Sequence, residues 1–379
     1  MPRMLASAQL PRRAGWGALV IPIARPQLGP EEETAVLEVM RSGALAQGAR
    51  VRAFEEAFAE KMGARFAVAT SNGTTALHLA LVAHGIGPGD EVITSPLTFI
   101  ATANAIAQTG ARPVLADIDD SLNLDPLAVA ELIGPRTRAI MPVHLYGNPC
   151  DMHAFAALAQ EHGIALIQDA CQAVGATIAG APLGTFGTAA YSLYATKNIT
   201  TGEGGMIITS DPKIAQTCAS LRHQAYSNQP YVHEAIGYNY RMTEMQAAIG
   251  VVQLQRLEEI TERRRSNACF YDRAITSGRF VRPTMNPGNR HVYHQYTLRA
   301  PSDGPICRDE VRARLEQAGV GTGVYYPVPV HKQPAYHRHD NPPCPRAELA
   351  ASEIFSIPVH PLVSDDDRAA VASAVNALI

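Results

Sequence analysis

One lysine of this chain stands where its amine could do chemistry, between an apolar segment and a glycine-rich turn. Lys197 follows the apolar residues 189–193 and precedes the turn Gly202–Gly205. A lysine amine becomes a nucleophile or a Schiff-base former only when it gives up its proton, and partial burial lowers its pKa for that purpose. Taken alone, a lysine at such a boundary is more often a solvated side chain. Its interpretation therefore depends on the residues upstream.

A candidate phosphate-binding turn lies upstream, at residues 71–75. This segment, Ser-Asn-Gly-Thr-Thr, follows a predicted strand and opens a predicted helix. Backbone N–H groups at the start of a helix bind anions, and the hydroxyl groups of the turn add further donors. The segment therefore predicts a phosphate site, although a tight turn with a capping box would also explain Thr74. Ser192, five residues before Lys197, could give its hydroxyl to the same phosphate.

Asp169 is the candidate partner for a positively charged group. It ends the apolar segment 164–169, so its side chain should lie at the carboxyl edge of the sheet, where open α/β sheets bind their ligands. If the ligand were a pyridine ring, the carboxylate would hold the ring nitrogen protonated and make the ring an electron sink. A helix N-cap for the turn at 170–172 is the alternative interpretation.

These residues together predict a site for pyridoxal 5′-phosphate. The turn at 71–75 would bind its phosphate, Asp169 its ring nitrogen and Lys197 its aldehyde. Phe99 could cover the face of the planar ring, although an aromatic residue at this place is as often part of a core. Each feature is a weak signal by itself, and the prediction depends on their combination.

The elements that must position these residues alternate between strands and helices from about residue 66 to residue 209. This alternation is typical of a mostly parallel sheet covered on both faces. The predicted strands are Phe66–Thr70, Glu91–Ser95, Pro113–Asp117, Ala139–Val143, Ala165–Asp169, Ala189–Leu193 and Gly205–Thr209. The predicted helices between them lie near 74–84, 100–109, 125–133 and 151–162. The simplest architecture is an α/β fold with one seven-stranded sheet.

The pattern changes after residue 243. A long helical segment leads into a smaller C-terminal α+β unit, with a strand at Val292–Arg299, a helix near 308–318 and a last helix from about Asp365. We therefore expect an N-terminal tail at residues 1–22, a large domain at residues 23–260 and a small domain at residues 261–379.

Composition argues against several classes of protein. The chain has 379 residues, of which 46% are hydrophobic and 18% are charged, as in a globular protein with sizeable cores. A formal net charge of -3 without a basic stripe argues against a nucleic-acid partner. Six cysteines form no CxxC pair and no zinc spacing, so we expect reduced thiols, no metal site and a cytoplasmic location. No segment reaches the roughly 18 apolar residues of a membrane-spanning helix, so we expect no membrane contact.

Several separated segments resemble the DegT/DnrJ/EryC1/StrS family of aminotransferases, from about Ile23 to the C-terminus. Their order and spacing both match, and the segments are 71–74, 98–104, 142–147, 169–172, 196–198 and 237–242. The resemblance implies the fold type I architecture of PLP-dependent transferases, with a large domain around a seven-stranded, mostly parallel sheet and a smaller C-terminal α+β domain. One departure is Gln168, where the family usually carries glutamate. We expect this side chain to point to the opposite face of its strand from Asp169.

The resemblance also implies a role for each cofactor-binding residue. Lys197 would hold the cofactor as a Schiff base and carry the proton, while Asp169 would pair with the pyridine nitrogen. Phe99 would stack on the ring, and Gln172 would contact the cofactor beside its 3-hydroxyl. The phosphate would be bound by Gly73, Thr74 and Ser192, joined by Asn239 from the second subunit of a homodimer with shared active sites.

The substrates implied by the resemblance are an amino donor and a keto sugar. Arg241 is the candidate for the donor's carboxylate, and Tyr325 and His331 match the family's loop near the sugar pocket. The donor would be L-glutamate or L-glutamine, and the acceptor a keto-sugar nucleotide or a keto-cyclitol. Lys197 is present, whereas family members that became dehydratases have lost this lysine, which favours transamination over deoxygenation.

Two alternatives remain beside an aminotransferase. The first is another fold type I enzyme, such as a lyase or a desulfurase, although no cysteine lies in an obvious exposed catalytic loop. The second is a regulatory protein that binds the cofactor or a sugar nucleotide without turnover. The presence of both Lys197 and Asp169 argues against this second alternative.

Overall fold

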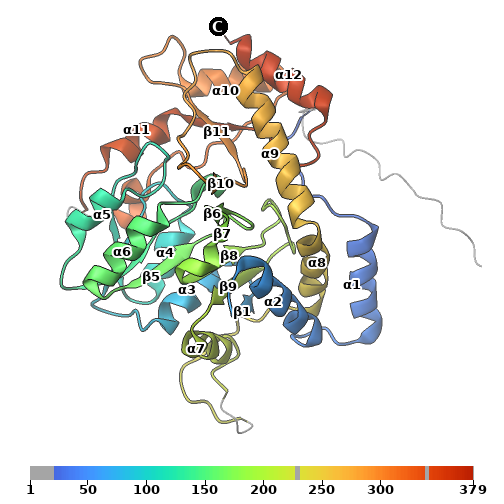
Figure 1. The fold of residues 1–379 in the computed structure, drawn as a ribbon, viewed down its shortest axis with the longest axis vertical. Coiled ribbons are helices and arrows are strands. Elements are labelled where there is room, and N and C mark those ends of the chain that lie inside the picture. The colour runs from blue at the N-terminus through green and yellow to red at the C-terminus, as the bar shows by residue number, and fades with distance from the viewer. Residues whose placement is uncertain (1–20, 227–230, 338–340, 379) are drawn as a thin grey trace, which may run out of the picture.

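The computed structural model describes residues 21–226, 231–337 and 341–378 (Figure 1). Of the predicted N-terminal tail, 1–22, residues 1–20 lie outside the described part of the chain. Ile21 is buried, and its backbone N–H donates to the carbonyl of Gly319 at 3.1 Å. It also forms a parallel bridge with Val320. The first described residue therefore already belongs to the packed structure.

A seven-stranded sheet forms the centre of the molecule and confirms the predicted α/β architecture (Figure 1). Its strands lie in the order β1-β9-β8-β5-β4-β2-β3, and all run parallel except β9. The strands are β1 (Phe66–Thr70), β2 (Glu91–Thr94), β3 (Arg112–Leu115), β4 (Thr137–Met141), β5 (Ala165–Asp169), β8 (Thr188–Ser192) and β9 (Gly205–Thr209). All seven predicted strands are present, with ends that differ by at most two residues.

Helices cover both faces of this sheet, because successive side chains of each strand point to opposite faces and both sets are apolar. Val68 and Ile207 belong to the core on one face, and Ala69 and Ile208 belong to the core on the other. The first core is covered by α3 (Gly73–Ala83), α4 (Ala101–Gln108) and α7 (Pro212–Arg222). The second is covered by α2 (Ala49–Met62), α5 (Pro126–Leu132), α6 (Met152–His162) and α8 (Glu244–Gln255).

A separate apolar core lies near the C-terminus. It is built by α10 (Arg308–Gln317), α12 (Asp365–Asn376) and the antiparallel pair β11 (Tyr296–Arg299) and β12 (Ile354–Ile357). Helix α9 (Leu257–Ala274) serves two cores, since Ile260 packs with the large sheet and Tyr271 with this C-terminal unit. The domain boundary after residue 260 stays a prediction, and we propose that it lies on this helix.

The strand predicted at 292–299 is shorter in the structure, where β11 begins at Tyr296. The preceding residues pair with a loop of the large sheet instead. The N–H of Val292 donates to the carbonyl of Gly147 at 3.0 Å, and the N–H of Gln295 donates to the carbonyl of Tyr146 at 3.3 Å. These bonds bring the segment 292–295 to the edge of the large sheet.

Other elements had no sequence prediction. They include α1 (Pro30–Ser42), α2, α7, α11 (Pro345–Glu353), β12 and a small sheet of β10 (Asn289–Arg290), β6 (Thr177–Ile178) and β7 (Ala181–Pro182). Across the part of the chain that the structure describes, no helix is both long and apolar enough to cross a membrane.

Candidate active site

A cavity of about 740 Å³ lies at the carboxyl ends of β5 and β8, beside the first residues of α3 and α4. This is the edge where parallel α/β sheets bind ligands. The predicted site residues that line it are Gly73, Thr74, Phe99, Asp169, Gln172, Ser192, Lys197 and Tyr325. Strands far apart in the sequence thus bring these side chains to one place.

The first turn of α3 leaves two backbone donors free at this cavity. The side chain of Asn72 caps the helix by accepting from the N–H of Thr75 at 2.9 Å. The N–H groups of Gly73 and Thr74 have no acceptor among the described residues. A Cβ atom at Gly73 would lie 2.7 Å from the Cβ of Ser192, so only glycine lets the helix approach β8 this closely. The arrangement fits a phosphate group.

Asp169 is almost fully buried, with an exposed fraction of 5%. Its Oδ2 accepts a hydrogen bond of 2.7 Å from the hydroxyl of Thr102, and its Oδ1 accepts one of 3.1 Å from the N–H of Cys171. The carboxylate is therefore oriented from both sides. It can still accept a bond from the cavity, because each oxygen has a second lone pair.

Lys197 is half-buried at the cavity wall, and its side-chain amine forms no hydrogen bond or ion pair with the described residues. Burial lowers the pKa of its amine, while Cys171 and Asp169 act in the opposite direction. The turn that carries it is held by hydrogen bonds from the N–H of Lys197 to the carbonyl of Tyr194 and from the N–H of Thr201 to the carbonyl of Leu193, each 2.9 Å long. A fixed amine with a lowered pKa is suited to proton transfer.

Two aromatic rings and an amide form another wall of the cavity. Phe99 is 54% exposed, and its ring centroid lies 5.6 Å from that of Tyr326. The Oε1 of Gln172 accepts from the N–H of Tyr146 at 2.8 Å, and its Nε2 donates to the hydroxyl of Tyr326 at 3.3 Å. The exposed face of Phe99 leaves room for a planar ring to stack on it.

Three predicted site residues do not line the cavity of their own chain. Asn239 is exposed, and Arg241 contacts the Nδ1 of His223 through its Nη1 at 2.8 Å. His331 is buried, with its Nε2 2.9 Å from Oε1 of Glu348. The last contact ties the loop after Tyr326 to α11 and leaves His331 outside the cavity lining.

Several residues of the lining were not singled out from the sequence. Thr102, in the first turn of α4, lies four residues after Thr98, which precedes the helix, and their hydroxyls are 2.8 Å apart. Tyr326 directly follows the predicted Tyr325. Cys171 and His294 also line the cavity. Cys171 lies within the segment 169–172, which carries part of the family resemblance, whereas no sequence pattern pointed to His294.

The environment of Gln168 agrees with the expectation that it faces away from Asp169. Its Oε1 lies 3.1 Å from the Nε2 of His144, and its own Nε2 donates to the carbonyl of Leu183 at 3.1 Å. Because the Nδ1 of His144 accepts from the N–H of Cys150, the ring carries its proton on Nε2 and donates to Gln168. Burial lowers the pKa of His144 to about 4, so this pair is neutral.

Known proteins are similar to this chain in sequence, and a solved structure is similar to it in fold. A protein of Geobacillus stearothermophilus called "Pleiotropic regulatory protein" is 43% identical over 92% of this chain and 94% of its own length. GDP-perosamine synthase of Caulobacter vibrioides is 40% identical over 95% of this chain and 98% of its own length. The solved structure of S. venezuelae DesV, in complex with a ketimine intermediate, is similar with a TM-score of 0.88 and a sequence identity of 39%. The match covers 92% of this chain and 94% of the DesV chain.

These likenesses confirm the predicted architecture, that of the PLP-dependent transferases of fold type I. The family profile matches residues 26–376, which include every residue predicted for the site. The chain is thus a member of the DegT/DnrJ/EryC1/StrS aminotransferase family.

Proposed function

We propose that this aminotransferase binds pyridoxal 5′-phosphate and moves an amino group from L-glutamate or L-glutamine to a keto-sugar nucleotide or a keto-cyclitol. The observation that carries the proposal is the arrangement of Lys197, Asp169 and the first turn of α3 around one cavity. An amine, a carboxylate and an anion site at the same edge of the sheet match the three polar ends of this cofactor.

The residues of the cavity fit the cofactor by their chemistry. The N–H groups of Gly73 and Thr74, which have no acceptor among the described residues, would hold the phosphate together with the Ser192 hydroxyl. The carboxylate of Asp169 would accept from a protonated ring nitrogen. The Lys197 amine, which has no partner among the described residues, would bind the aldehyde.

The bound cofactor would supply an aldehyde that takes up the amino group and a ring that stores the electron pair released at the substrate carbon. The amine of Lys197 would accept the proton from the donor's α-carbon and return a proton in the second half of the cycle. Thr102 and the N–H of Cys171 would keep the carboxylate of Asp169 in one orientation throughout. The chain's own contribution is thus binding, orientation and proton movement.

The donor's carboxylate needs a cation, and the described residues of the cavity lining offer none besides Lys197. Among the described residues of the lining, Lys197 is the only lysine or arginine, and it has to move a proton. Arg241 and Asn239 lie outside the lining of their own chain. We infer that they serve the cavity of a second copy in a homodimer, where Arg241 would bind the carboxylate and Asn239 the phosphate.

The class of acceptor is supported by the relatives. GDP-perosamine synthase is named for a GDP-linked product, which favours a nucleotide-linked keto sugar for this chain. Tyr325 lines the cavity and would face such an acceptor. A keto-cyclitol is the second candidate class of acceptor.

Two rival functions follow from particular observations. A desulfurase needs a reactive thiolate. Cys171 does line the cavity, but burial and the charge of Asp169 raise its pKa well above its usual value, which disfavours that chemistry. The relative named as a regulatory protein favours a binding role without turnover. The lowered pKa of Lys197 favours turnover instead.

Transfer of labelled nitrogen tests the proposal. The protein, loaded with pyridoxal 5′-phosphate, is incubated with L-glutamate or L-glutamine labelled in the amino group and with a set of nucleotide-linked keto sugars and keto-cyclitols. We expect mass spectrometry to find the label in one acceptor, and not with Lys197→Ala. Absence of transfer from both donors to every acceptor, with the cofactor bound, would favour the regulatory alternative.

A further inference from the structure

One buried histidine of the cavity has no role in the scheme above. His294 is 7% exposed and lines the cavity that holds Lys197. Its Nδ1 is enclosed by protein without a hydrogen-bond partner, and its Nε2 also has none among the described residues. A buried polar ring that has no hydrogen-bond partner in the protein usually finds its partner in a bound ligand or water.

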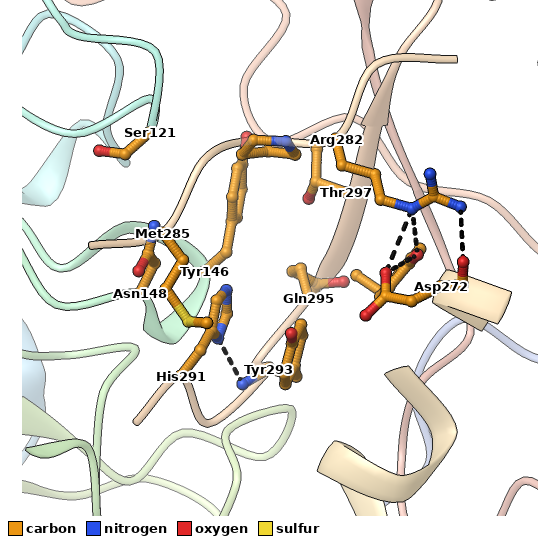
Figure 2. A pocket seen from close by; sticks show the side chains of 12 residues that line it. Ser121, Tyr146, Asn148, Asp272, Arg282, Met285, His291, Tyr293, Gln295 and Thr297 are labelled. Atoms are coloured by element: carbon orange, nitrogen blue, oxygen red, sulfur yellow. Dashed lines mark hydrogen bonds and ion pairs between the residues drawn. The ribbon is translucent and has the colours of Figure 1, made fainter. Parts of the chain in front are cut away.

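The irregular segment before β11, in which Tyr293 has a left-handed φ of 45°, places the ring of His294 at the cavity. His291 and Tyr293 line a second cavity of about 190 Å³, which Figure 2 shows, whereas His294 lines the first. Gln295 lines both cavities and lies between them.

Contacts with several parts of the chain fix the segment 292–294 at the cavity. The Nδ2 of Asn198, the residue after Lys197, donates to the carbonyl of Val292 at 2.9 Å. The guanidinium of Arg264 donates to the carbonyl of Tyr293 at 3.1 Å. A Cβ atom at Gly147 would lie 2.7 Å from the Cγ2 of Val292, so glycine allows this close contact. The histidine is thus fixed to the same turn as the catalytic lysine.

The environment keeps the ring uncharged. Burial lowers the pKa of His294 well below its usual value, and the positive charges of Lys197 and Arg264 lower it further. A neutral imidazole has one N–H and one bare nitrogen. A buried N–H without an acceptor is rare, so we assign the bare nitrogen to the enclosed Nδ1 and the proton to Nε2.

We propose that His294 donates a hydrogen bond from Nε2 to the keto oxygen of the substrate, at the carbon that exchanges its oxygen for nitrogen. This inference rests on the proposed function. A neutral imidazole polarises a carbonyl without giving up its proton. A carboxylate of the substrate would instead be bound better by a positively charged side chain than by a neutral imidazole, because charge-assisted hydrogen bonds are stronger. His294 and Lys197 line the same cavity, and the lysine must reach the reacting carbon, so this placement also favours that carbon.

The test compares His294→Leu with His294→Gln, whose amide nitrogen takes the position of the imidazole Nε2. Protein loaded with pyridoxamine 5′-phosphate is mixed with 2-oxoglutarate or 2-oxoglutaramate, the keto acids of the two proposed donors, and the visible absorption is followed over a single turnover. We expect His294→Leu to slow this reaction about 100-fold, as the loss of one preorganised donor does elsewhere. His294→Gln should restore most of the rate.

A second measurement separates the keto oxygen from the carboxylates. Glutarate carries both carboxylates of 2-oxoglutarate but no keto oxygen, and its inhibition constant should be equal in wild type and both variants. Cofactor affinity, from absorption titration, should also be unchanged. Weaker inhibition by glutarate in His294→Leu would assign the histidine to a carboxylate and overturn the proposal.

The other possible results of these measurements would also support or refute the role of His294. Equal single-turnover rates in the wild type and His294→Leu would refute the role of His294. If His294→Leu does not fold by circular dichroism, His294→Gln is compared with His294→Asn, whose shorter amide should not restore the rate, and equal rates there would refute the role too. If the wild type reacts with neither keto acid, the proposed donors fail and the proposed function with them.

Discussion

Thr102 donates a hydrogen bond of 2.7 Å from its hydroxyl to Oδ2 of Asp169. Because that proton points to the carboxylate, the 2.8 Å contact between Thr98 and Thr102 must be donated by Thr98. The two threonines are almost fully buried, Thr102 in α4 and Thr98 in the segment that precedes this helix. They form a short relay that fixes the orientation of the carboxylate proposed to bind the cofactor's ring nitrogen.

Removing the Thr102 hydroxyl should therefore weaken cofactor binding. A hydrogen bond to a charged group contributes about 1.5–3 kcal/mol, which corresponds to about 10-fold to 100-fold in a dissociation constant. We expect this loss in Thr102→Val, measured by titration of the apoprotein with pyridoxal 5′-phosphate. Thr102→Ser retains the hydroxyl and should bind as the wild type does. Equal affinity in all three proteins would show that the relay does not orient Asp169.

The close approach of α3 to β8 predicts a defect specific to phosphate. In Gly73→Ala, the new Cβ would lie 2.7 Å from the Cβ of Ser192 and 3.1 Å from the Sγ of Cys171, so the first turn of α3 has to shift. Binding of pyridoxal 5′-phosphate should weaken, whereas binding of pyridoxal, which has no phosphate, should not. Gly87→Ala is the matched control, because the nearest atom to its new Cβ lies 4.0 Å away. Equal weakening for both ligands would contradict a phosphate site at this turn.

The amine of Lys197 has no partner among the described residues and should destabilise the apoprotein. Burial lowers its pKa from the ordinary value of 10.5, so between the two pKa values the unfolded chain binds more protons than the folded chain. Stability then rises with pH through that window, and below it the full penalty applies. We expect the apoprotein of Lys197→Met to have a higher urea midpoint than the wild type at neutral pH, and a smaller rise on going to alkaline pH.

Lys61→Met serves as the control for that comparison, because Lys61 is exposed at the end of α2. It should leave both the midpoint and its pH dependence close to those of the wild type. A lower midpoint in Lys197→Met than in the wild type would show that the amine is not a destabilising group in the apoprotein.

A buried carboxylate outside the cavity lining, that of Glu244, fixes the start of α2. Oε1 of Glu244 accepts from the N–H groups of Gly48 and Val51 at 2.8 and 2.9 Å, and Oε2 accepts from that of Arg50 at 2.9 Å. In Glu244→Gln one oxygen becomes an NH₂ group that faces a backbone donor. We expect a loss of about 2 kcal/mol in the free energy of unfolding by urea. Glu60→Gln, exposed on the same helix, should change it little, and an equal effect of both would contradict the capping role.

Much of the large sheet could be predicted, because its strands carry continuous apolar segments ended by glycine or polar residues. Val68 and Ala69, or Ile207 and Ile208, are apolar on both faces of the sheet, which is the pattern of a buried parallel sheet. Helices α1 and α2 were not predicted, because their apolar residues are mixed with charged ones. The strand before β11 was predicted too long, since pairing of Val292 with Gly147 is a tertiary contact that no local pattern records.

Some residues of the candidate site could also be placed from the sequence, and others could not. Asp169 and Gly73 lie at the ends of recognisable elements, so their position at the sheet edge followed from the order of strands and helices. His294 lies in an irregular segment, and its place in the cavity depends on Asn198 and Gly147, which are distant in sequence. Roles for Asn239 and Arg241 require a second copy of the chain and stay predictions.

The most direct test of the role proposed for Lys197 is the visible absorption of the purified protein after incubation with pyridoxal 5′-phosphate, alone and with L-glutamate or L-glutamine. We predict a visible band that withstands removal of free cofactor, is lost on addition of one of the two donors, and is missing in Lys197→Ala. A protein that stays colourless after incubation with the cofactor, or a band that Lys197→Ala retains unchanged, would contradict the central role of Lys197.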